Sequence, residues 1–284
     1  MPPLGFNVVI VEPKGYVFNR AFLDIAKLLV ESLRSLGHPV QQSVHRLLPE
    51  CVNILLGYHV LPGTKVMKQA RCIVYQLEQL SFRDRRFPEQ GEKWLSLLEA
   101  ARQVWDYSDE NIALLRSRGF ANVKRVPIGF HESMRQVPRD RHQDVDVLFY
   151  GQLNARRVAV LNELAKRCQV RVLVRVYGAE RDDWIARSRI VLNMHFHDAE
   201  MFEQARVSYL LNNGRFVISE QAPDNPYGDG IIQAPYEQLV DRCLEYLGKP
   251  QERDEIALRG AELFQKLPMT DFIRAAIDGE TWPA

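Results

Sequence analysis

Residues 190–220 alternate two apolar runs with one amphipathic segment, and this alternation restricts the fold more than any other feature of the sequence. The apolar runs, at 190–192 and 216–218, have the length of buried strands. Four apolar residues between them recur at helical spacing: Phe202, Ala205, Tyr209 and Leu210. Strand, helix and strand in this order are typical of a parallel sheet, where strand ends and helix N-termini form a crevice that favours anions. The stretch therefore predicts a site for a phosphate-bearing ligand.

The same alternation runs through the first half of the chain. Apolar, β-branched runs predict buried strands at 6–11, 52–56, 72–76, 103–107 and 123–126. Helical spacing predicts helices at 19–36 and 91–102, and Ser108 is placed to cap a third helix that Gly119 ends. Strands that alternate with helices indicate a parallel sheet covered by helices.

The second half repeats this organisation. Strands are predicted at 147–150 and 170–176, and helices at 156–167, 182–187, 236–247 and 251–267. We therefore expect an α/β fold of two Rossmann-like, doubly wound domains that face each other across a cleft. The expected boundaries are 1–130 for the first domain, 131–143 for a proline-containing, charged linker, and 144–267 for the second domain. A tail, 268–284, is expected to pack back on the first domain.

Composition limits the classes of partner. The formal net charge of +1 provides no broad basic surface for nucleic acid or an anionic membrane. The 4 cysteines lack CxxC spacing, so neither a zinc site nor a disulfide framework is indicated. Because the N-terminus does not resemble a signal peptide and no run of about 18 apolar residues occurs, we expect a cytoplasmic protein without an integral membrane segment.

Two adjacent arginines follow a predicted strand and a glycine turn. Gly151 would let a ligand approach the backbone closely, and Arg156 or Arg157 could bind a diphosphate through paired hydrogen bonds. The alternative is a plain turn with both arginines solvated. Binding is favoured, because a cation at a helix start opposes the helix dipole unless an anion lies nearby.

Further polar residues follow the strand at 190–192. His195 and His197 share one face of an extended segment, which suits hydrogen bonds to a sugar or phosphate, a metal pair, or two ordinary loop residues. Glu203 and Arg206 are three residues apart on the next helix, so they could pair with each other or contact the ligand.

Other charged residues lie at predicted strand ends. Asp144 and Asp146 resemble a metal-binding Asp-x-Asp pair, but they precede their strand and so are interpreted as charges at the start of the strand. In the first half, His59, Glu78 and Asp106 each lie at or just after the end of a strand. Any of the three could take a proton from an acceptor hydroxyl, although polar residues at strand ends are common.

Several runs of the sequence carry a resemblance to a known family. These are DVDVLFYGQLNARR, VYGAERDDWIARSRIVLNMHF and FEQARVSYLLNNGRFVISE in the second half, with IVYQLEQL, QVWDYSDENIALL and VPIGF in the first. They resemble an uncharacterised group of bacterial GT-B-fold glycosyltransferases, whose donor domain is similar to family 1 and 4 C-terminal domains. The resemblance covers about residues 53–247.

The resemblance implies a nucleotide-sugar donor, UDP- or GDP-linked, on the second domain and an acceptor on the first. It implies catalysis without an obligatory metal or other cofactor. The implied donor site consists of Gly151, Asn154, Arg156, Arg157, Gly178, His195, His197, Glu203, Arg206 and Ser208. The chain departs from the family where many retaining members carry a ribose-binding glutamate, because Tyr209 stands there.

Three hypotheses follow. The leading one is transfer of a sugar to a hydroxyl of a glycan, a protein, a small molecule or modified DNA, with His59, Glu78 or Asp106 as the base if the reaction inverts. The second is a non-catalytic module of the same fold that binds a nucleotide or glycan. The third, weaker one is a metal-dependent hydrolase that uses His195 and His197.

Overall fold

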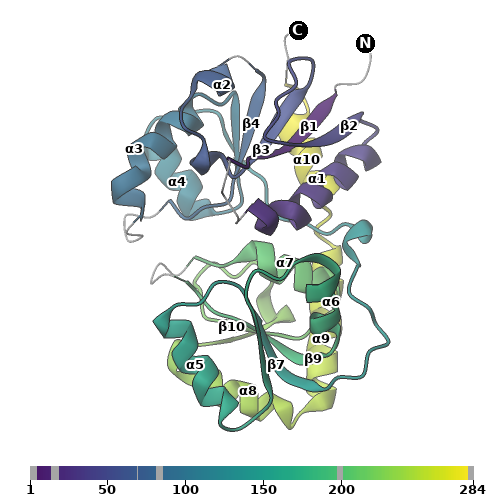
Figure 1. Ribbon diagram of the computed structural model, residues 1–284. Coiled ribbons are helices and arrows are strands. Elements are labelled where there is room, and N and C mark those ends of the chain that lie inside the picture. The colour runs from purple at the N-terminus through teal and green to yellow at the C-terminus, as the bar shows by residue number, and fades with distance from the viewer. Residues whose placement is uncertain (1–4, 14–18, 69, 81–85, 197–200, 281–284) are drawn as a thin grey trace. The chain divides into compact units, whose positions relative to one another are not determined.

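The computed structural model describes residues 5–13, 19–68, 70–80, 86–196 and 201–280 (Figure 1). The chain divides into two compact units. The first comprises Met1–His131 and Pro268–Ala284, and the second comprises Glu132–Leu267. The division therefore places 132–143 with the second unit and the C-terminal segment with the first.

The first unit is built on a sheet of six parallel strands among the described residues, in the order β2-β1-β3-β4-β5-β6. The strands are β1 (Phe6–Ile10), β2 (Val40–Val44), β3 (Val52–Leu56), β4 (Cys72–Gln76), β5 (Gln103–Asp106) and β6 (Val123–Arg125). The central strands β1, β3, β4 and β5 are buried at every position, as expected for apolar runs covered on both faces.

Helices cover both faces of this sheet. They are α1 (Leu23–Ser35), α2 (Lys65–Lys68), α3 (Arg86–Glu99), α4 (Asp109–Ser117) and α10 (Met269–Ile277). Figure 1 shows α1 and α10 together on one side of the sheet and α3 and α4 on the other. Trp94 of α3 and Leu115 of α4 belong to the core on their side of the sheet.

The second unit has a five-stranded parallel sheet in the order β11-β10-β9-β7-β8. Its strands are β7 (Val145–Tyr150), β8 (Val170–Leu173), β9 (Ser188–Asn193), β10 (Val217–Glu220) and β11 (Ile232–Ala234). Val147 pairs with Ile190, and Leu192 pairs with Ile218, so β7, β9 and β10 end at the same edge.

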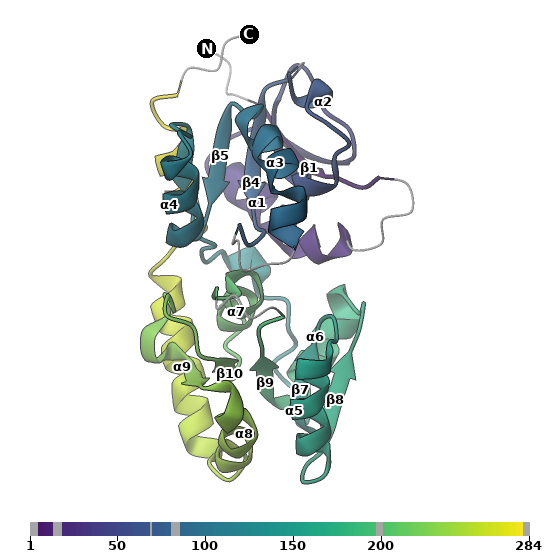
Figure 2. The same cartoon turned by 90° about the vertical axis from the view of Figure 1, so that its left-hand side faces the viewer.

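The helices of the second unit are α5 (Ala155–Ala165), α6 (Gly178–Ala186), α7 (Gln204–Asn212), α8 (Leu239–Leu247) and α9 (Pro250–Gln265). Figure 2 shows these helices around the sheet from a second direction. Leu161 and Leu164 of α5 share one core with Leu239 and Cys243 of α8, beside the buried side chains of β7 and β9. On another side, α7 packs against α9.

The prediction of two parallel α/β halves is confirmed. The edge strands β2 and β11 were not predicted, because VQQSV is largely polar and exposed and IQA is only 3 residues long. Helix α10 was also missed, since the tail was expected to pack back without an assigned helix. Within the described residues, no helix combines the length and the apolar character that crossing a bilayer requires. The cytoplasmic location stays a prediction.

Candidate functional site

The polar residues predicted for the second unit gather at the carboxyl edge of its sheet. Helices α5, α6 and α7 begin after β7, β8 and β9, so their N-termini all lie at this edge. The first turn of a helix leaves backbone N–H groups without intrahelical partners, which favours anions there. Both the strand ends and the helix starts therefore direct polar groups to one place.

Arg157 lies at the centre of this edge and is buried, with 3% of its side chain exposed. Its Nη2 donates to Glu203 Oε1 at 2.9 Å and to the carbonyl of Met194, and its Nη1 donates to the carbonyl of Gln152 at 2.9 Å. Nε donates to the carbonyl of His195 at 3.3 Å. Burial lowers the pKa of Arg157 to about 10, and the Glu203 carboxylate opposes that shift. Arg157 is thus charged at neutral pH and joins the loops after β7 and β9.

Arg156 points to the end of β10. Its guanidinium makes two contacts with the carboxylate of Glu220, one of them 2.6 Å from Nη1 to Oε2, and stacks 3.8 Å from the centre of the Tyr236 ring. Glu220 also accepts a hydrogen bond from the backbone N–H of His195 at 3.0 Å. This pair fixes the ends of β9 and β10 relative to α5.

Arg206, near the start of α7, is the more exposed of the two arginines that contact Glu203. Its Nη1 lies 2.8 Å from Glu203 Oε2 and donates to Asn193 Oδ1 at 2.6 Å. Within the described part of the chain, its Nε and Nη2 have no hydrogen-bond acceptor. Gly151 has a φ of 139°, and a Cβ there would lie 2.9 Å from Nη2 of Arg206. The glycine therefore leaves the space that this guanidinium occupies.

Asn154 and His195 complete the edge. Asn154 caps α5 by accepting from the backbone N–H of Arg157 at 2.9 Å, and its amide donates to the carbonyl of Phe196 at 2.6 Å. His195 is 1% exposed, and its Nε2 lies 3.2 Å from the carbonyl of Gln221. Because a carbonyl only accepts, this contact places a proton on Nε2, and in the neutral imidazole Nδ1 is then an acceptor. This Nδ1 is buried and has no hydrogen-bond partner among the described residues.

The remaining three predicted donor-site residues are Gly178, Ser208 and His197. Gly178 is the first residue of α6, with a φ of 63° and open space where a Cβ would stand. Ser208 is buried within α7, and its hydroxyl donates to the carbonyl of Ala205 at 3.4 Å. His197 lies outside the described residues.

The described charges of this cluster nearly balance. Among the residues that the structure describes there, three arginines face two glutamates, Glu203 and Glu220, an excess of one positive charge. Arginines at the start of α5 oppose the helix dipole unless an anion lies nearby. The two glutamates supply that negative charge, so the position of the arginines alone does not require a ligand. Glu220 was missed because it is 64 residues from Arg156; its place at the end of β10 was the available signal.

The base candidates of the first unit also share one sheet edge. His59 lies just after β3, and its Nδ1 is 3.4 Å from Oε1 of Glu78, which follows β4. The side chains are 11% and 19% exposed, so both are partly open to solvent. The His59 ring lies 5.7 Å from that of Trp94 and 6.5 Å from that of Phe22. An imidazole and a carboxylate so arranged can exchange a proton with an external hydroxyl.

Asp106 differs from the other two because it is fully buried. Its Oδ1 accepts from the backbone N–H of Ser108 at 2.8 Å, and its Oδ2 accepts from Gln76 and Asn111, each at 3.0 Å. Burial raises the pKa of Asp106 to about 7, although these hydrogen bonds act to lower it. With both oxygens occupied and none exposed, Asp106 is poorly placed to take a proton from an external acceptor.

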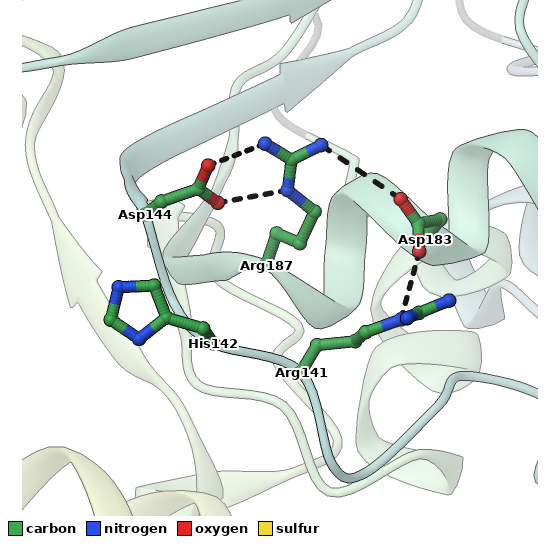
Figure 3. A pocket seen from close by; sticks show the side chains of 5 residues that line it. All are labelled: Arg141, His142, Asp144, Asp183 and Arg187. Atoms are coloured by element: carbon green, nitrogen blue, oxygen red, sulfur yellow. Dashed lines mark hydrogen bonds and ion pairs between the residues drawn. The ribbon is translucent and has the colours of Figure 1, made fainter.

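A pocket of about 400 Å³ lies at the opposite edge of the second sheet, where β7 and β9 begin (Figure 3). Its lining charges are paired: Arg141 Nε lies 3.0 Å from Asp183, and Arg187 Nε donates to Asp144 at 2.8 Å. Arg187 lowers the pKa of Asp144. None of the predicted site residues that the structure describes lines this pocket. The geometry agrees with the interpretation of Asp144 as a charge at the start of a strand.

No group of three or more histidine, cysteine or acidic side chains among the described residues is arranged to hold a metal ion. The metal hypothesis requires His197, which the structure does not describe, so it stays a prediction.

No protein-family model matches the chain. Two uncharacterised proteins of Acanthamoeba polyphaga mimivirus are similar to it. One is 28% identical over 156 residues, which cover 51% of this chain and 50% of the relative. The other is 29% identical over 154 residues, which cover 51% and 53%. The matched segments thus span about half of the length of these curated relatives.

Solved structures resemble the chain over nearly its whole length. Anabaena HepE in complex with UDP has a TM-score of 0.62 at 12% identity, covering 98% of this chain and 100% of that one. AviGT4, a glycosyltransferase involved in avilamycin A biosynthesis, has a TM-score of 0.58 at 14% identity, covering 99% and 100%. An α-glucosyltransferase in complex with UDP and a 13-mer DNA has a TM-score of 0.52 at 10% identity, covering 98% and 99%. At these identities the likeness shows the fold, which is GT-B.

Proposed function

We propose that this chain is a glycosyltransferase that moves a sugar from a nucleoside-diphosphate sugar to a hydroxyl acceptor without a required metal. The observation that carries the proposal is the arginine and glutamate cluster at the carboxyl edge of the second sheet. There Arg206, on α7, lies beside Gly151 at the end of β7 and keeps Nε and Nη2 without acceptors among the described residues. Structures of the same fold that were solved with UDP support the donor class.

The described side chains would divide the work. Arg206 would bind the diphosphate and stabilise the charge that develops as the bond from the sugar to the diphosphate breaks. Glu203 would orient Arg206, and Arg157 would hold Glu203 from the other side. Nδ1 of His195 would accept a hydrogen bond from a donor hydroxyl.

The acceptor step is assigned to the first unit. As the bond from the acceptor oxygen to the anomeric carbon forms, the hydroxyl proton would pass to the pair of His59 and Glu78, if the reaction inverts. The acceptor itself is proposed only by class, as a hydroxyl of a glycan, protein, small molecule or modified DNA. DNA is included in this class because the structure of an α-glucosyltransferase with a similar fold was solved in complex with UDP and a 13-mer DNA.

Thermal unfolding with UDP-, GDP-, dTDP- and CMP-sugars, with and without EDTA, tests the donor site. A ligand that binds only the folded state raises the midpoint. We expect one nucleotide family to raise it equally with and without EDTA, and Arg206→Gln to weaken the effect. Arg167→Gln, at an exposed arginine of the same unit, is the matched control. A rise that EDTA abolishes would contradict metal independence.

The second candidate is a non-catalytic module that binds the nucleotide. It is kept because the arginine and glutamate cluster lies wholly within the second unit, and a binding module would contain the same cluster. Release of nucleoside diphosphate from the donor, in the presence of an acceptor panel, separates the two. Tight binding without any release would favour the module.

A further inference from the structure

Asp106 is surrounded by hydrogen-bond donors of two other elements. Gln76 ends β4 and Asn111 lies on α4, and the side-chain amides of both donate to Oδ2 of Asp106 at 3.0 Å. The backbone N–H of Ser108 donates to Oδ1 at 2.8 Å. Above its pKa of about 7 the Asp106 carboxylate has only acceptors, so it can satisfy all three donors at once.

The same two amides also hold the segment after β4. Gln76 accepts from the backbone N–H of Glu78 at 2.5 Å and donates to the Glu78 carbonyl at 2.6 Å. Asn111 donates to the Glu78 carbonyl at 3.0 Å and accepts from the backbone N–H of Leu80 at 3.0 Å. Both backbone polar groups of Glu78 are thereby fixed by amides whose orientation Asp106 sets.

The side chain of Glu78 leaves this fixed backbone toward His59, whose Nδ1 is 3.4 Å from Oε1. His59 lies on the turn after β3 and Glu78 follows β4, so their contact joins two segments that follow different strands. Holding the segment after β4 in place therefore helps to set this contact.

We infer that Asp106 is a positioning residue, which acts through Gln76 and Asn111 to hold the Glu78 carboxylate beside His59. The effect of this positioning on catalysis rests on the proposed function, in which His59 and Glu78 receive the acceptor proton. Asp106 itself touches neither side chain in this arrangement and stays buried beneath the edge.

Asp106→Asn, compared with the wild type above pH 7, where Asp106 is ionised, tests the role with almost no change of shape. The substituted amide would place an N–H₂ group against either Ser108 or the amides of Gln76 and Asn111, so one set of contacts must break. We expect the NMR resonance of the His59 ring to move as it does in Glu78→Gln. Asn111→Ala removes the second amide and should move it in the same direction. Asp109→Asn, at an exposed aspartate of the same helix, is the matched control.

Kinetics supply the second measurement. Asp106→Asn should lower kcat at least about tenfold, since a positioned general base contributes roughly 10²–10⁴-fold. The affinity for the donor should not change, because the proposed donor residues belong to the other unit.

The outcomes separate the two proposals. An unmoved His59 resonance in both Asp106→Asn and Asn111→Ala overturns the positioning role, whatever the enzyme does. If the resonance moves but kcat is unchanged in both variants, Asp106 positions Glu78, and the assignment of His59 and Glu78 as the base is overturned. If the wild-type protein transfers no sugar but the three variants move the His59 resonance alike, the positioning by Asp106 is supported and the proposed transferase is not.

Discussion

Gly151, at the end of β7, leaves room for the guanidinium of Arg206: a Cβ on Gly151 would lie 2.9 Å from Nη2 of Arg206. The glycine has a φ of 139°, a conformation that other residues rarely adopt. The absence of a side chain at this position thus determines where the guanidinium lies.

Gly151→Ala should therefore displace Arg206 and weaken binding of the nucleotide sugar by about tenfold or more, equivalent to roughly 1.4 kcal/mol. Backbone strain should also lower the free energy of unfolding by about 1–3 kcal/mol. Calorimetric titration and urea denaturation measure the two effects. Gly228→Ala is the control, because its φ of 52° is also positive but nothing lies near a Cβ there. Equal donor affinity in both variants would show that the contact with Arg206 is irrelevant.

The raised pKa of Asp106 predicts how stability depends on pH. Burial raises the pKa from 3.8 to about 7 in the folded state, so between these values the folded protein binds a proton that the unfolded chain does not. The stability that this proton adds is complete below the pKa of Asp106 in the unfolded chain. It is lost as the pH rises through the pKa in the folded protein, with a slope of at most about 1.4 kcal/mol per pH unit. Asp106→Asn should remove this part of the slope between pH 4 and 7.

Urea denaturation of both proteins at several pH values measures the difference, with Asp109→Asn as the control. The buried Tyr58 interacts electrostatically with Asp106, but burial raises the pKa of Tyr58 well above its ordinary value of 10.0, so Tyr58 does not titrate in this window. A wild-type protein whose stability relative to Asp106→Asn rises from pH 4 to 7 would falsify the assignment.

Helix α9 contacts the loop before β11 through two glycines. A Cβ on Gly260 would collide with the carbonyl oxygen of Gly230 and lie 2.7 Å from Cδ2 of Leu211. Alanine is favoured over glycine in a helix by about 1 kcal/mol. Overpacking against rigid backbone costs about 1–3 kcal/mol or more, so Gly260→Ala should still lower the free energy of unfolding.

Gly248→Ala is the matched control for this helix contact. Gly248 has a φ of −78°, and its nearest neighbour to a Cβ is the carbonyl oxygen of Glu245 at 3.4 Å. We expect a neutral or slightly stabilising effect there. Gly260→Ala at or above wild-type stability in urea would mean that the loop yields easily.

Local patterns account for what the sequence predicted well. Ser108 caps α4 as expected, because a hydroxyl before a helical run can accept from the N–H three residues on. Glu203 and Arg206 lie at 2.8 Å from each other, as their spacing allowed. The strands were recognised where burial on both faces made them continuously apolar.

Contacts between distant residues account for what was missed. The pairing of Arg156 with Glu220 joins residues 64 positions apart, and that of Gln76 with Asp106 joins residues 30 apart. No periodicity reports such contacts. The sequence could place Asp106 at a strand end. Only its burial in the structure shows that it positions neighbouring side chains and does not contact the acceptor substrate.

The contrast between Arg157 and Arg206 yields the last prediction. Arg157 is buried and donates four hydrogen bonds, three of them to backbone carbonyls, whereas Arg206 keeps Nε and Nη2 without acceptors among the described residues. Arg157→Met should leave Glu203 and these carbonyls unpaired and cost about 3–5 kcal/mol of stability. Arg206→Met should cost less stability but lower the affinity for the nucleotide-sugar donor by roughly 10-fold to 100-fold, since a hydrogen bond to a charged group contributes about 1.5–3 kcal/mol.

Urea denaturation and calorimetric titration on both variants separate the roles, with Arg167→Met as the exposed control. If Arg206→Met unfolds as easily as Arg157→Met, both arginines are structural and the diphosphate must be bound by other groups. If Arg157→Met stays stable but no longer binds the donor, the ligand contacts Arg157 despite the burial of this side chain. The contact between Arg157 and Glu203 would then have to break when the donor binds, because it covers the Arg157 guanidinium.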